Sequence, residues 1–176
     1  MNMTIKTLLL AATAAGLWHT ASAHVVLDQP AALAGSTYKA TLRIGHGCDG
    51  RATTLVKVRV PEGMRGARPM PKAGWTLQAT KAPLAQPYDS HGKRITEDVR
   101  EITWEGGPLP DAWADEFSFV AQLPAQPGPL PIQVLQQCGN EARLEWFDVA
   151  VPGAKPPRSP APVLEVLPGD GSGHAH

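Results

Sequence analysis

The residue with the most distinctive chemistry is His24, which directly follows the small-residue sequence Ala21-Ser-Ala23. Residues 1–23 have the pattern of a secretory signal peptide, with Lys6 near the start, an apolar run at 8–17 and a small-residue cleavage site. Cleavage after Ala23 makes histidine the first residue of the mature protein. Its free α-amine and its imidazole Nδ1 can then chelate a single copper ion together, which no internal histidine can do. The alternative is that histidine is incidental here, since some residue must follow the cleavage site.

Two further residues are candidates for the same site. Glu116 lies on a predicted strand, on the face opposite the two phenylalanines at 117 and 119. It is either a solvated edge glutamate or an oxygen ligand that completes a copper site begun by His24. Trp146 shares a face with Leu144 on a later strand, where a core role is the default for tryptophan. Spacing alone does not choose between these readings.

The chain has two cysteines, Cys48 and Cys138. An even count in an exported chain predicts one disulfide. Closing a loop of about 90 residues would stabilise the fold by roughly 4–5 kcal/mol in the chain-entropy model. A thiolate site for Cu(I), with nearby His46, is the alternative.

The other histidines offer little. His91 lies in a polar loop, and His174-Ala-His176 ends the chain, where a flexible pair either binds metal weakly or is simply solvated. The sequence has no His-x-x-His, Cys-x-x-Cys or Gly-x-Ser-x-Gly motif, which argues against zinc hydrolase, thioredoxin-like and serine hydrolase chemistry.

Composition sets the class of protein. Removing residues 1–23 from 176 leaves 153 residues, and Lys6 is the only charge lost from 16 basic and 16 acidic side chains. That length suits one globular domain, and the near-neutral charge argues against a nucleic-acid partner. No second apolar segment is long enough to span a membrane. No cysteine follows the signal sequence, so we expect no lipoprotein anchor and a periplasmic protein free of the membrane.

The elements that must position these residues are predicted to be short strands. Alternating apolar and polar residues with β-branched and aromatic side chains predict strands at 36–44, 54–60, 100–104, 116–123, 130–135 and 143–149, separated by Gly and Pro clusters such as 106–108. No sustained helical period occurs. About seven such strands predict an all-β fold, an antiparallel β-sandwich over residues 24–152. Residues 153–176 are rich in Pro and Gly and predict a disordered tail.

Several blocks of the sequence resemble the YcnI-like copper-binding family. They are the run 23–30 beginning Ala-His-Val-Val-Leu, the run 34–48 ending Gly-His-Gly-Cys, Pro71-Lys-Ala-Gly-Trp-Thr-Leu77, Asp115-Glu-Phe-Ser-Phe119 and Glu145-Trp146. The resemblance implies an immunoglobulin/fibronectin-like β-sandwich that holds Cu(II) through a monohistidine brace. It assigns the amine and ring nitrogens to His24, an oxygen to Glu116, and a nearby tryptophan to Trp146, a set that suits Cu(II). The cysteine pair and the Gly-His-Gly turn resemble one branch of the family, and His46 is kept out of the site.

The expected function is that of an exported copper-binding protein, not an enzyme, acting in copper trafficking, storage or homeostasis. The expected partners are a periplasmic copper chaperone or a membrane copper transporter. One alternative is a copper-dependent polysaccharide-oxidising enzyme, which would need a second histidine from His46 or His91. The other is a metal-free secreted interaction domain.

Overall fold

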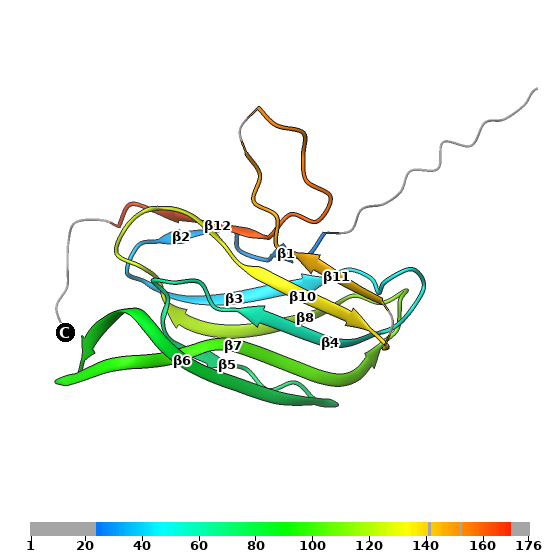
Figure 1. Cartoon of the computed structure of the whole chain (residues 1–176), viewed down its shortest axis with the longest axis horizontal. Coiled ribbons are helices and arrows are strands. Elements are labelled where there is room, and N and C mark those ends of the chain that lie inside the picture. Colours follow the sequence, from blue (N-terminus) through cyan, green and yellow to red (C-terminus); the bar gives the residue numbers. More distant parts are fainter. Residues whose placement is uncertain (1–23, 141, 152, 170–176) are drawn as a thin grey trace, which may run out of the picture.

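The computed structural model describes residues 24–140, 142–151 and 153–169, and all regular structure in them is β-strand (Figure 1). Two sheets face one another, and a third, small sheet lies beside them. The four-stranded sheet has the order β1 (Val26–Leu27), β3 (Thr37–Ile44), β8 (Asp115–Gln122) and β5 (Arg65–Pro69). The five-stranded sheet has the order β11 (Ala142–Trp146), β10 (Gln133–Cys138), β4 (Thr53–Arg59), β7 (Lys93–Leu109) and β6 (Trp75–Ser90). The third sheet has the order β2 (Ala31–Leu33), β12 (Val163–Leu167) and β9 (Gly128–Pro131). The predicted all-β sandwich is confirmed.

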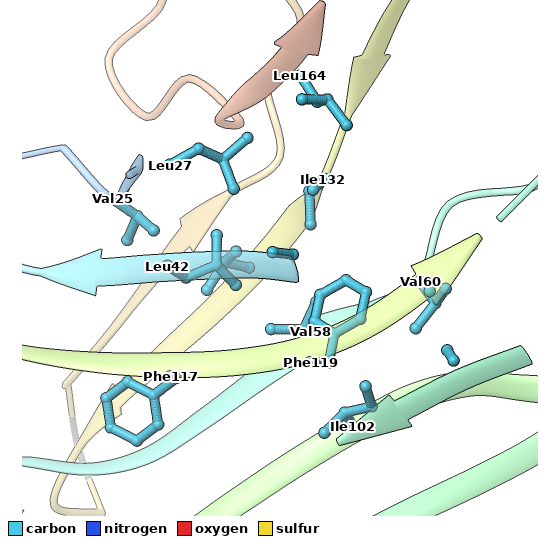
Figure 2. Packing of buried hydrophobic residues seen from close by; sticks show 14 of the residues in the cluster. Val25, Leu27, Leu42, Val58, Val60, Ile102, Phe117, Phe119, Ile132 and Leu164 are labelled. Carbon is cyan, nitrogen blue, oxygen red and sulfur yellow. The ribbon is translucent and has the colours of Figure 1, made fainter. Parts of the chain in front are cut away.

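The core forms where the alternating strands of the two large sheets face each other. On β3 and β8 every second side chain is buried, and these side chains meet those of β4, β7 and β10 (Figure 2). The largest buried side chains in this layer include Trp104, Phe117, Phe119, Leu42 and Ile102. Burying each of them contributes roughly 1.5–3 kcal/mol, so the alternation fixes which face of each strand looks inward.

The Gly-Pro cluster at 106–108 does not end a strand as predicted, because β7 continues through it to Leu109. Gly106 and Gly107 have φ angles of 131° and 82°, which favour glycine. A Cβ on Gly107 would lie 2.6 Å from Cζ2 of Trp75. The glycines therefore let the strand bend while the Trp75 ring packs closely against it and against Phe117.

Residues 153–167 differ from the predicted disordered tail. β12 pairs parallel to β2 and antiparallel to β9, which makes β2–β12 the one parallel strand pair among the described strands. Leu164 and Val166 are buried, and Figure 2 shows Leu164 close to Ile132. The folded unit thus extends past the predicted boundary at residue 152 to β12. A Pro-rich composition concealed a five-residue strand whose Leu and Val alternate correctly for one buried face.

Residues 1–23 and the histidines at 174 and 176 lie outside the described residues, so the predicted signal peptide and the His-x-His end remain predictions. No helix long and apolar enough to cross a membrane occurs in the part of the chain that the structure describes.

Candidate metal centre

His24 lies just before β1, at the open side of the sandwich. β1 is the edge strand of the four-stranded sheet and β11 is the edge strand of the five-stranded sheet, and the two lie near each other (Figure 1). The His24 ring packs edge-on against Trp146 at the end of β11, with 5.7 Å between ring centroids and 75° between ring planes. Val25 and Leu27 are buried and anchor this start of the folded chain. The structure therefore brings two of the three predicted site residues into contact.

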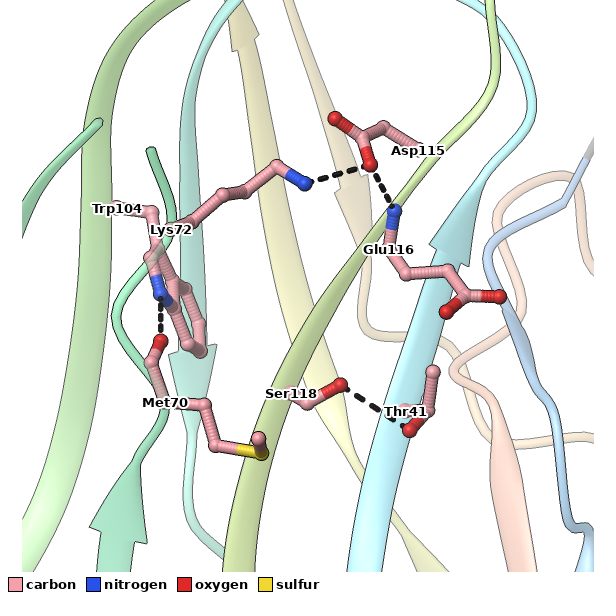
Figure 3. Close-up of polar contacts among 7 residues, drawn as sticks. All are labelled: Thr41, Met70, Lys72, Trp104, Asp115, Glu116 and Ser118. Atoms are coloured by element: carbon pink, nitrogen blue, oxygen red, sulfur yellow. Dashed lines mark hydrogen bonds and ion pairs between the residues drawn. The ribbon is translucent and has the colours of Figure 1, made fainter. Parts of the chain in front are cut away.

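Glu116 lies on the same sheet as the segment that follows His24. The strand register aligns Val26 of β1 with Arg43 of β3, and Arg43 with Glu116 of β8. Neighbouring strands are about 4.8 Å apart, so about 10 Å of sheet separates the backbones of Val26 and Glu116. The exposed Glu116 side chain is directed toward β3 (Figure 3). Among the described residues its carboxylate takes part in no ion pair.

The neighbouring carboxylate, Asp115, is already neutralised. Lys72 Nζ lies 2.5 Å from Asp115 Oδ1, and the Glu116 backbone N–H donates to that same oxygen at 2.8 Å (Figure 3). The indole N–H of Trp104 donates to the Met70 carbonyl oxygen at 2.9 Å, which fixes the loop that carries Lys72. Of these two adjacent acidic residues, Asp115 is held in an ion pair and Glu116 is not, among the residues that the structure describes. Sequence reasoning missed the lysine, although it stands in the block at 71–77.

Trp146 is a core residue that also contacts the candidate ligand His24. It is 4% exposed and belongs to the hydrophobic core, yet its ring also contacts His24. Its indole N–H donates to Gln136 Oε1 at 3.4 Å. The indole N–H therefore points into the protein, and the ring itself is what faces the candidate ligand.

Gln136 is a residue that sequence reasoning missed. It lies on β10 in phase with Val134 and Cys138, and all three are buried. A polar side chain at a core-facing position of an alternating strand needs hydrogen-bond partners, and this was the signal that could have found it.

The predicted disulfide is confirmed. Cys48 and Cys138 are joined, with 5.7 Å between their Cα atoms, and both are buried. The bond ties the turn after β3 to the end of β10, so it links the two large sheets. No free cysteine occurs in the described residues, which removes the thiolate alternative for the folded, oxidised protein.

The structure brings neither of the other described histidines to this site. The Nδ1 atom of His46 contacts the carbonyl oxygen of the next residue, Gly47. His91 lies in the turn between β6 and β7 with a φ of 48°. Across the described ranges, no three His, Cys, Asp or Glu side chains gather as a metal-binding group.

The residues present fit Cu(II) in number and chemistry. The mature chain would supply two nitrogens from His24 alone and an oxygen from the unpaired carboxylate of Glu116, donors that Cu(II) accepts. Because one residue supplies two donors, such a site needs only two side chains. It does not require a cluster of three.

Fold and disulfide together define a disulfide-linked, immunoglobulin-like β-sandwich protein. The chain belongs to the DUF1775 family, a domain of unknown function, whose family model matches residues 24–166. It is similar to an uncharacterized protein from Nocardia farcinica whose crystal structure reveals an immunoglobulin-like fold. The TM-score is 0.64 at 22% sequence identity, over 81% of this chain and 97% of that chain, so this likeness concerns the fold. A comparison with curated proteins finds no match.

Proposed function

We propose that this protein is exported, begins at His24 when mature, and holds one Cu(II) through His24 and Glu116. The observation that carries the proposal is the placement of His24. The family match begins at this residue, directly after a signal-like segment, and its ring packs on Trp146. The sequence blocks that resemble the YcnI-like copper-binding family include all three residues.

Each residue has a separate task in this proposal. The His24 amine and Nδ1 form the chelate, and Glu116 adds a negative charge that offsets part of the charge of the ion. Trp146 has only an indole N–H, which donates and cannot ligate a cation. Its ring covers one side of the ion, excludes water and limits redox cycling, as groups around a metal commonly tune it.

Binding and transfer suit this site better than catalysis does. A polysaccharide-oxidising copper enzyme needs a second histidine, and the structure directs His46 to a backbone carbonyl and leaves His91 at a hairpin turn. We therefore propose copper as the cargo, held in the periplasm for storage or for transfer to a copper chaperone or membrane copper transporter.

The test compares two forms of the mature protein, one starting at His24 and one with a single added glycine before it. The extra residue converts the amine donor into an amide and breaks the chelate. Calorimetric titration with Cu(II) should then show at least about a hundredfold weaker binding, and electron paramagnetic resonance should show two nitrogen donors only in the native form. Equal affinity of the two forms, or three nitrogen donors in the native form, would refute the brace.

A further inference from the structure

A buried polar side chain lies directly behind the candidate site. Gln136 is 1% exposed, and it sits on β10 among core residues. Its Oε1 accepts the indole N–H of Trp146, and its Nε2 donates to the carbonyl oxygen of His46 at 2.7 Å and to Thr53 Oγ1 at 2.8 Å. The amide therefore uses its acceptor and both of its donors in the core.

The partners fix which way this amide points. A backbone carbonyl oxygen only accepts, so the NH₂ group must face His46, and Oε1 must face Trp146, whose indole N–H only donates. Thr53 accepts from the NH₂ group and lies 3.8 Å from Cys138 Sγ, to which its hydroxyl can donate weakly. Reversing the amide would set two donors against each other at Trp146 and two acceptors against each other at His46.

This network joins three parts of the molecule. At one end is the Trp146 ring, which also contacts the His24 ring. At the other end are the turn that carries His46 and the disulfide at Cys138. A buried donor left without a partner destabilises the folded protein, so the network restricts the rotation of the Trp146 ring.

We propose that Gln136 is the positioning residue of the copper site, holding Trp146 by its indole N–H so that the ring lies against His24. The inference rests on the proposed function for its copper consequences, but the placement of Trp146 is testable without copper. Gln136 never touches the ion; it acts through the tryptophan.

The first test uses the copper-free mature protein. Gln136→Met keeps the length of the side chain and removes its hydrogen bonds. The matched control is Gln137→Met on the opposite face of β10, where the half-buried glutamine donates to Gly139 O. In NMR spectra, the His24 ring protons should lose the ring-current displacement due to Trp146 in Gln136→Met and keep it in Gln137→Met. Retention of that displacement in Gln136→Met would overturn the proposal.

The second test is a double-mutant cycle with copper bound. Gln136→Met should shift the paramagnetic resonance spectrum and the Cu(II)/Cu(I) midpoint in the same direction as Trp146→Phe. Combined with Trp146→Phe it should add nothing, because the bond it would break is already absent. Additive shifts would mean that Gln136 acts by a general structural effect and would refute positioning through Trp146.

A third variant and the wild type distinguish failure of this inference from failure of the proposed function. If Gln136→Met does not fold, Thr53→Val is used instead, because it removes only one of the two acceptors of the amide. It should reduce the ring-current displacement of the His24 ring protons only in part. An unchanged displacement would contradict the inference. If wild-type mature protein binds no copper, the proposed function fails, while the copper-free NMR test still decides the role of Gln136.

Discussion

Replacing Cys48 and Cys138 together by alanine should lower the free energy of unfolding by about 4–5 kcal/mol. The two residues are 90 apart in sequence, and the chain-entropy model gives roughly −15.5 cal/mol/K for closing a loop of that length in the unfolded chain. At 25 °C this entropy corresponds to about 4.6 kcal/mol. The loss is a large part of the 5–15 kcal/mol that typical domains have, so the variant should be only marginally stable.

The assay is urea unfolding of the mature, copper-free protein, followed by tryptophan fluorescence. The wild type is measured with and without reductant, and reduced wild type should unfold near the midpoint of the alanine variant. A loss below about 1 kcal/mol with an unchanged slope would refute the reasoning, because it would mean that the bond does not restrict the unfolded chain.

Three other predictions concern single residues. Glu116→Gln should lower the Cu(II) affinity at least about tenfold in calorimetric titration, while the thermal midpoint of unfolding stays within about 2 °C of the wild-type value. The reason is that the exposed amide keeps the volume of the side chain but not its charge. An unchanged affinity would remove Glu116 from the site. Trp146→Phe should lower the free energy of unfolding by about 1–3 kcal/mol in denaturant unfolding and also change the copper spectrum, because the ring both belongs to the core and contacts His24. An unaltered spectrum would mean that Trp146 has only a core role. Burial, assisted by the charge of Asp28, raises the pKa of Tyr38 from 10.0 to about 12, so the folded state keeps a proton that the unfolded chain releases. Stability should therefore fall as pH rises from about 10 to about 12, and the fall should be smaller in Tyr38→Phe; equal slopes for the two proteins would contradict this origin.

The strands that formed the centre of the sandwich were predictable. β8 alternates between a buried and a less buried face, and β3 does so apart from the additional buried residue Thr41; burial of one face of each strand forces that pattern into the sequence. The disulfide was predictable too, because an even number of cysteines after a signal-like segment predicts a disulfide. β12 was not, since only its partners β2 and β9 show that Leu164 and Val166 are core residues.

Residue types and their order in the chain were enough to name the candidates: a histidine directly after a signal-like segment, a glutamate on the outward face of a strand, and a tryptophan late in the chain. How these residues are arranged depends on the tertiary structure. Lys72 forms an ion pair with Asp115 and not with Glu116. Gln136 accepts the indole N–H of Trp146, so that the N–H points inward and the ring contacts His24. Residues 24, 146 and 136 meet through the packing of two sheet edges, and sheet pairing places Glu116 two strands away from the segment that follows His24. Local residue patterns do not encode such contacts, because each depends on partners far apart in the chain.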